Sequence, residues 1–170
     1  MDAKGFTLIE LMAALSLLAI LSLIAAPSFS AYLRDCRQSA ATDTITHAVH
    51  AARLLAATHG RLVEICPSRN GRDCATGEDW GDMLLLRQAP AATDAAPVRA
   101  IQLPSGEPPL TVRANSDSIR FTPLVPAATA ATITVCDDRG PEFAAAVIIS
   151  RSGRPRLSGR DAGGASLQCP

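Results

Sequence analysis

The 170-residue chain has few aromatic side chains, no net charge and almost no lysine. Aromatic residues make up 4% of the sequence, with one tryptophan and one tyrosine, so a platform that stacks the bases of single-stranded nucleic acid is poorly supported. The 16 basic and 16 acidic residues cancel, so no field of the whole molecule attracts nucleic acid or acidic proteins. Any such attraction must be local.

Catalytic and metal-binding patterns are also missing from the sequence. It contains no G-x-S-x-G motif, no C-x2-C pair and no histidine spacing typical of structural zinc. Asp137 and Asp138 are neighbours, and adjacent strand residues point to opposite faces, so this pair suits a turn or a pairing with arginine better than shared catalysis. His47 and His50 lie one helical turn apart, but we predict no metal site there. We expect neither an enzyme nor a bound metal or cofactor.

Charge is absent from a long N-terminal stretch, apart from one carboxylate. Residues 5–10 read Gly-Phe-Thr-Leu-Ile-Glu, and no charged residue follows Glu10 before Arg34. Residues 6–26 are long enough to cross a membrane, since about 20 apolar residues span a bilayer. A charge near the start of a membrane helix costs about 2.5–3.5 kcal/mol, so Glu10 needs a partner, which we do not expect within this chain. A signal peptide with Lys4 as its basic region, or a plain signal anchor, leaves Glu10 unexplained.

This N-terminal motif resembles that of the type IV prepilins, a short polar leader followed by Gly, Phe, Thr, Leu, Ile and Glu. The resemblance implies that a prepilin peptidase cleaves between Gly5 and Phe6 and methylates the new amino group of Phe6. It also implies that the Glu10 carboxylate meets the N-terminal amine of a neighbouring subunit. Two charges that are costly in lipid then cancel only on assembly. The expected partners are other pilins and pseudopilins, bound through the N-terminal helix.

The chain divides into four predicted parts. We expect a prepilin leader over 1–5, a transmembrane and assembly helix over 6–27, an amphipathic helix over 28–60 and a β-rich globular domain over 61–170. Pro27 should kink the helix or loosen one turn.

The amphipathic helix carries apolar residues at steps of three to five, which we expect to face a sheet. They are Phe29, Leu33, Cys36, Ala40, Ile45, Val49, Ala52 and Leu55. Cys36 belongs to this stripe and is therefore expected to be a small buried hydrophobe. Gly60 then serves as the C-cap of the helix.

Short β-like runs broken by Pro, Gly and Asp follow Gly60. The candidate strands are Leu62–Cys66, Met83–Arg87, Val98–Leu103, Leu110–Arg113, Ser118–Thr122, Thr132–Cys136, Ala145–Ser150 and Arg156–Ser158. Seven or eight short strands imply an antiparallel sheet. The predicted fold is α+β and pilin-like, with a long N-terminal helix packed on an antiparallel β-sheet domain. Ala89–Pro97 and Pro123–Ala131 lack periodicity and are predicted loops, and Trp80 is predicted to pack between a loop and the sheet.

Five cysteines allow two disulfides and leave one thiol. Cys66 and Cys74 enclose a loop with Pro and Asn-Gly turn chemistry, which brings the two thiols together. Cys136 ends a β-branched run and Cys169 is the penultimate residue, so a bridge between them would pin the C-terminus to the sheet. Disulfides form in oxidising compartments, so if these bridges exist the globular domain lies outside the cytoplasm. The prepilin resemblance then implies a single pass in the bacterial inner membrane, with the domain in the periplasm before entry into a pilus or pseudopilus.

The motifs of the exported domain follow an order that resembles the GspH/FimT-type minor pilins and pseudopilins. This resemblance spans most of the domain. It rests on Ile65-Cys66-Pro67-Ser68, Cys74, Trp80, Cys136-Asp137-Asp138-Arg139-Gly140, Gly153-Arg154-Pro155-Arg156 and Cys169.

A basic cluster lies near the C-terminus. Residues 151–160 contain Arg at four positions and no acidic residue, whereas the average Arg content of this chain predicts about one Arg in ten residues. Gly153 permits a turn, and in an extended segment Arg154 and Arg156 project to one face about 7 Å apart. Arginine grips phosphate with planar, bidentate donors and does not read bases. FimT-type minor pilins linked to DNA uptake carry a Gly-Arg-x-Arg element, and residues 153–156 match it.

Two functions remain open at this point. The first is a minor pilin of a type IV pilus that binds double-stranded DNA non-specifically during natural transformation, through Arg151, Gly153, Arg154, Arg156 and Arg160. The second is a structural tip or priming subunit of a pilus or a type II secretion pseudopilus, in which the arginines contact neighbouring subunits or are solvated.

Overall fold

A computed structural model describes residues 7–81, 83–88, 99–123 and 127–169. The chain forms two compact units, residues 1–36 and 37–170. Helix α1 (Leu8–His59) contributes to both units, and Pro27 lies inside it without ending it. Gly60 follows with a φ of 62°, the left-handed conformation expected of a C-cap. An unburied segment of α1 with a mean hydropathy of 2.5 is long and apolar enough to cross a membrane, judged by length and composition.

The face of α1 that packs in the globular unit consists mainly of small residues. Its buried residues are Gln38, Ala41, Thr42, Ile45, Ala48, Val49, Ala52 and Ala56. Alanine side chains let the helix backbone approach the strands closely, so the contact needs few large side chains.

The predicted apolar stripe is therefore correct only in its second half. Ile45, Val49 and Ala52 are buried and Leu55 packs at the edge of the core, whereas the earlier members Phe29, Leu33, Cys36 and Ala40 are exposed. The burial expected for Cys36 was wrong. The buried face begins only at Gln38 and passes through Ala41 rather than Ala40, so residue types alone misplaced it.

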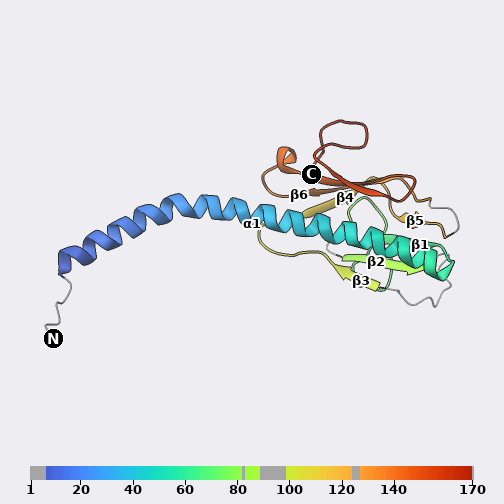
Figure 1. The fold of residues 1–170 in the computed structure, drawn as a ribbon, viewed down its shortest axis with the longest axis horizontal. Coiled ribbons are helices and arrows are strands. Elements are labelled where there is room, and N and C mark those ends of the chain that lie inside the picture. Colours follow the sequence, from blue (N-terminus) through green and yellow to red (C-terminus); the bar gives the residue numbers. More distant parts are fainter. Residues whose placement is uncertain (1–6, 82, 89–98, 124–126, 170) are drawn as a thin grey trace. The chain divides into compact units, whose positions relative to one another are not determined.

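Eight strands form two four-stranded antiparallel sheets (Figure 1). The first sheet has the order β3-β2-β1-β5 and the second the order β4-β6-β7-β8. The strands are β1 (Val63–Pro67), β2 (Met83–Gln88), β3 (Arg99–Gln102), β4 (Thr111–Ala114), β5 (Ile119–Phe121), β6 (Ala131–Cys136), β7 (Ala145–Ile149) and β8 (Pro155–Ser158). All eight predicted runs are confirmed to within about two residues. The predicted loop 89–97 lies outside the described residues, as does part of the loop 123–131.

One main core lies between α1 and the inner faces of both sheets. In Figure 1 the C-terminal half of α1 runs across the two sheets, with β2 and β3 on one side and β4 and β6 on the other. Ile65, Leu86, Ile133 and Val147 belong to this core. Trp80 is fully buried in it, and its indole Nε1 donates to the Ser116 carbonyl at 3.0 Å, which agrees with the packing role predicted for it.

The C-terminal tail covers part of the other face of the second sheet. Leu167 packs there in a smaller cluster with Cys136, Ala146 and Ile148. Cys136 is bonded to Cys169 within this cluster, with a Cα–Cα distance of 5.9 Å. The tail is thus attached to β6, as the sequence predicts.

The second disulfide closes a loop after β1. Cys66 is bonded to Cys74 with a Cα–Cα distance of 5.6 Å. Inside the loop, Asn70 Oδ1 accepts hydrogen bonds from the backbone N–H groups of Arg72 and Asp73, both at 2.9 Å. This turn brings the two cysteines together, as the loop composition indicates.

Candidate nucleic-acid interface

The arginine cluster is built on the β7–β8 hairpin. The register pairs Ile149 with Pro155, so residues 150–154 form the connecting turn. The turn is closed by Ser150 N–H, which donates to the Arg154 carbonyl at 3.1 Å, and by Gly153 N–H, which donates to the Ser150 carbonyl at 2.8 Å. The Ser150 hydroxyl also accepts from Arg154 N–H at 3.2 Å. Arg151 and Arg154 are therefore presented by a hydrogen-bonded turn.

Gly153 is the position in this turn that demands glycine. Its φ is 73°, which side chains other than glycine adopt at a cost. Gly153 is buried, and a Cβ there would lie 3.4 Å from the Phe121 ring and 3.5 Å from Ala128. The turn thus packs directly on β5 and on the segment that follows it.

The cluster's arginines on this hairpin are exposed. Arg151, Arg154 and Arg156 are all solvent-accessible. Arg156 pairs with Ile148, so it lies on the face of the second sheet that carries the C-terminal tail. The next pair, Leu157 and Val147, lies on the opposite face, where Val147 belongs to the main core. Among the described residues, none of these three arginines forms an ion pair. Their charges are available to an external anion.

Arg160 differs from the other three. Its guanidinium Nη1 donates to the Gly164 carbonyl at 3.1 Å, and its backbone N–H donates to the Ser158 hydroxyl at 3.1 Å. Arg160 also forms an isolated β-bridge with Ser166. Although exposed, it is tied to the loop that leads into the C-terminal tail. Within the described part of the chain, the Arg160 guanidinium therefore makes a hydrogen bond, whereas the guanidinium groups of the other three make none.

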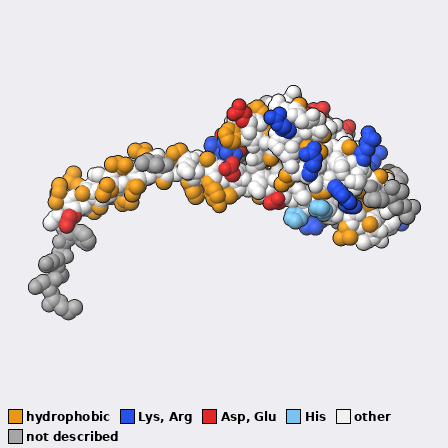
Figure 2. Space-filling model, turned by 45° about the horizontal axis from the view of Figure 1, so that its top comes forward, with side chains coloured by type: hydrophobic (Ala, Val, Ile, Leu, Met, Phe, Trp, Pro, Cys, Tyr) orange, Lys and Arg blue, Asp and Glu red, His pale blue; other side chains and the backbone are white. Residues whose placement is uncertain are grey.

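Basic side chains occur at separate points across the globular part in Figure 2. They do not merge into one continuous surface in that view, in keeping with a chain of zero net charge. Attraction for a polyanion then depends on a few well-placed arginines rather than on a general positive field.

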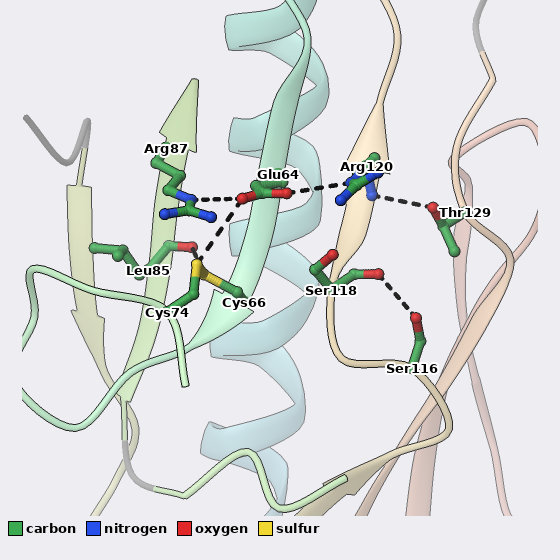
Figure 3. Close-up of polar contacts among 9 residues, drawn as sticks. All are labelled: Glu64, Cys66, Cys74, Leu85, Arg87, Ser116, Ser118, Arg120 and Thr129. Atoms are coloured by element: carbon green, nitrogen blue, oxygen red, sulfur yellow. Dashed lines mark hydrogen bonds and ion pairs between the residues drawn. A yellow bond between two sulfur atoms is a disulfide. The ribbon is translucent and has the colours of Figure 1, made fainter. Parts of the chain in front are cut away.

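A buried carboxylate between two arginines is the polar cluster that the sequence did not reveal. Glu64 on β1 is 3% exposed, and its Oε1 and Oε2 atoms lie 2.5 Å from Arg87 Nε and 3.3 Å from Arg120 Nε. The register aligns Arg87, Glu64 and Arg120 in one row across β2, β1 and β5 (Figure 3). The Cys66–Cys74 disulfide lies beside this row, with Cys74 Sγ 3.9 Å from Glu64 Oε1.

The two adjacent aspartates after β6 have a structural contact. Asp137 is buried, and its Oδ2 accepts hydrogen bonds from Arg139 Nε at 2.9 Å and from Arg139 Nη2 at 2.6 Å. The same guanidinium lies over the Phe143 ring, 4.6 Å from its centroid. This pairing with arginine is the alternative that the sequence favoured over shared catalysis. Within the described residues, no group of three or more His, Cys, Asp or Glu side chains is arranged to hold a metal.

The processing region is described only in part. Gly5 and Phe6 lie outside the described residues. Glu10 accepts hydrogen bonds from the Thr7 backbone N–H at 2.9 Å and from the Thr7 hydroxyl at 2.8 Å, and Thr7 Oγ1 lies 3.4 Å from the Glu10 N–H. This is the reciprocal capping box of a helix N-terminus. Glu10 therefore has a neutral hydrogen-bond partner within its own chain, and this contact leaves its charge unbalanced.

The comparisons with known proteins agree with this architecture. Residues 41–153 match the family described as Type II transport protein GspH, and residues 1–26 match the prokaryotic N-terminal methylation motif. Two crystal forms of the Pseudomonas aeruginosa (strain PAO1) type IV minor pilin FimU are similar in fold, with TM-scores of 0.56 and 0.57 at 20% and 22% identity. The matches cover 76% and 79% of this chain, and 97% and 95% of FimU. No curated protein matches the sequence.

A long N-terminal helix that begins within a methylation motif and packs on antiparallel sheets defines a pilin-like protein of the type IV pilus and pseudopilus class. Within that class, the chain belongs to the GspH family, whose match covers more than half of its length. Members of this family are structural pilins and pseudopilins that are processed at the N-terminus and assemble with other pilins.

Proposed function

We propose that this minor pilin binds double-stranded DNA without sequence preference and acts in DNA uptake during natural transformation. The observation that carries the proposal is the β7–β8 turn, which presents Arg151 and Arg154 from a rigid backbone beside Arg156. None of the three is neutralised by a carboxylate among the described residues. Such arginines suit phosphate, which accepts bidentate hydrogen bonds from the guanidinium group.

The same proposal includes the route by which the protein reaches DNA. A prepilin peptidase cleaves between Gly5 and Phe6 and methylates Phe6, and the segment 6–27 holds the chain in the inner membrane. The globular domain then lies in the periplasm, where the two disulfides are stable. Glu10 meets the N-terminal amine of the next subunit as the chain enters the pilus.

A gel-retardation titration of the full-length chain in neutral detergent tests DNA binding. Replacing Arg154 and Arg156 by Gln removes two phosphate contacts and should weaken binding of a duplex by at least about tenfold at low salt. For the three contacts of Arg151, Arg154 and Arg156, the plot of log K against log salt should have a slope of about minus 2.7. If the parent chain does not retard DNA at low salt, the proposal is wrong. If the double variant binds as well as the parent, the site is misplaced.

A second candidate function is a structural subunit of a type II secretion pseudopilus or of a pilus tip. The family description and the contact of Arg160 with the Gly164 carbonyl favour it, since an arginine that holds a loop needs no ligand. In that case the parent chain should co-purify with other pseudopilins and should show no salt-dependent affinity for DNA.

A further inference from the structure

We propose that the DNA surface continues from the C-terminal hairpin to Arg120 on β5, which supplies a phosphate contact from a different part of the sequence. This inference rests on the DNA binding proposed above. It adds a residue that lies 31 positions before Arg151 and outside the basic cluster. The evidence is the backbone connection between the two arginines, the packing of the turn on β5 and the charge balance around Glu64.

A short segment of chain connects β5 to the basic turn. The Thr129 N–H donates to the Arg120 carbonyl at 3.0 Å, and the Ala128 N–H donates to the Arg151 carbonyl at 2.7 Å. The Thr129 hydroxyl accepts from Arg120 N–H at 3.3 Å. Residues 128–129 therefore lie between the two arginines like one intervening strand. With strands about 4.8 Å apart, the backbones of Arg120 and Arg151 are separated by about 10 Å.

The hairpin is held against β5 by side-chain packing as well. Gly153 contacts the ring of Phe121, the residue after Arg120, closely enough that a Cβ would lie 3.4 Å from it. Ala128 packs at the same point. The turn and β5 thus form one surface, and the positions of their arginines are fixed relative to each other.

The charges around Glu64 leave Arg120 able to bind an anion. Two guanidinium groups face one carboxylate, so the row carries one surplus positive charge. Arg87 holds Glu64 at 2.5 Å with its side chain 27% exposed, whereas Arg120 contacts it at 3.3 Å with its side chain 63% exposed. Arg120 can turn toward a phosphate while Glu64 keeps Arg87, so no buried charge is left unpaired.

The hydrogen-bonding groups of Arg120 suit this role. Its bond to Glu64 uses Nε, and its two terminal nitrogens make no hydrogen bond with the described part of the chain. Figure 3 shows Arg120 between Glu64 and Thr129, on the side of the row away from Arg87. The backbones of Arg120 and Arg151 lie about 10 Å apart, which is about one Debye length at 0.1 M salt. The fields of the two arginines then add for a phosphate backbone that crosses both.

The experiment is the same titration, applied to Arg120→Gln in the full-length chain with a 30-base-pair duplex. Loss of one phosphate contact should weaken binding about three- to tenfold at 50 mM salt and reduce the salt slope by about 0.9. Arg99→Gln is the matched control, because it removes one exposed arginine from β3, at the opposite edge of the same sheet. It should change affinity less than about twofold. Arg120→Lys keeps the charge and should retain most of the binding.

Two further variants test the same idea if Arg120→Gln impairs folding. Glu64→Gln releases Arg120 and should tighten DNA binding about two- to threefold, whereas Glu78→Gln makes the same charge change next to Arg113 and should have a smaller effect. Equal affinities for Arg120→Gln and Arg99→Gln, or for Glu64→Gln and Glu78→Gln, would overturn this inference. If the parent chain binds and the Arg154/Arg156 variant does not, that result leaves the proposed function intact. Absence of binding by the parent chain would instead refute the proposed function itself.

Discussion

The side-chain amide of Gln38 donates a hydrogen bond to the backbone carbonyl of Phe143 at 2.7 Å. The same Nε2 atom donates to the Val135 carbonyl at 3.2 Å, so both of its hydrogens are used. Gln38 is 8% exposed and marks the start of the buried face of α1. A polar side chain therefore fixes where the helix meets the second sheet, at a point that apolar patterning does not identify.

Loss of this amide should destabilise the globular unit. In Gln38→Ala the carbonyls of Phe143 and Val135 each lose one hydrogen-bond donor, which should reduce the free energy of unfolding by about 1–3 kcal/mol. Urea unfolding followed by the fluorescence of Trp80, the sole tryptophan, measures this change. Ser39→Ala, at an exposed neighbouring position, serves as the control and should change stability by less than about 0.5 kcal/mol. Similar stabilities for the two variants would show that the Gln38 contacts contribute little.

Gly153→Ala should distort the basic turn. An alanine at a φ of 73° costs about 1–2 kcal/mol, and its Cβ would press on the Phe121 ring. Because the turn positions Arg151 and Arg154, DNA affinity should fall although no charge is removed. Gly159→Ala provides the comparison, since a Cβ there meets nothing within 4 Å. Unchanged stability and DNA binding in Gly153→Ala would mean that the turn tolerates another conformation.

The two disulfides should contribute unequally to stability. The Cys136–Cys169 bond spans 33 residues and the Cys66–Cys74 bond spans 8. Loop-closure entropy then predicts losses of about 3–4 and about 2–3 kcal/mol when each pair is replaced by Ser. Urea midpoints of the two double variants check the order. The reverse order would indicate that packing of the tail, rather than chain entropy, decides the effect.

Variants at Thr7 and Glu10 separate the two roles of the Glu10 carboxylate. Thr7→Ala removes the hydroxyl of the capping box but keeps the charge, whereas Glu10→Gln keeps an N-terminal capping amide and removes the charge. If the carboxylate pairs with the amine of a neighbouring subunit, Glu10→Gln should block incorporation into filaments while Thr7→Ala assembles. Immunoblots of sheared filaments measure incorporation, and mass spectrometry of the mature chain establishes that both variants begin at Phe6. Normal assembly of Glu10→Gln would refute the amine pairing.

Local sequence signals predicted the strands and the Cys66–Cys74 disulfide because those features depend on neighbouring residues. Runs such as residues 132–136 and 145–150 combine β-branched or apolar residues with flanking turn residues, and each became a strand. The Cys66–Cys74 loop contains its own turn. These elements needed no information about distant parts of the chain.

Features that depend on tertiary register were not predictable in the same way. Which face of α1 is buried depends on whether Ala40 or Ala41 contacts the sheets, and both residues are small and apolar. The Arg87–Glu64–Arg120 row requires the pairing of three strands that are not all consecutive in the sequence. The approach of Arg120 to Arg151 depends on hydrogen bonds of residues 128–129. In each case the packing of segments that are remote in the sequence determines which residues come into contact, and residue type alone does not determine it.

The exposure of Cys36 has a practical consequence for the mature subunit. The other four cysteines are consumed in disulfides, so a maleimide reagent applied without reductant finds one accessible sulfur on the helix. A fluorophore attached there would report on the surroundings of α1 before and after polymerisation. Quenching or protection of that dye upon incorporation would map which flank of the helix the neighbouring subunit covers.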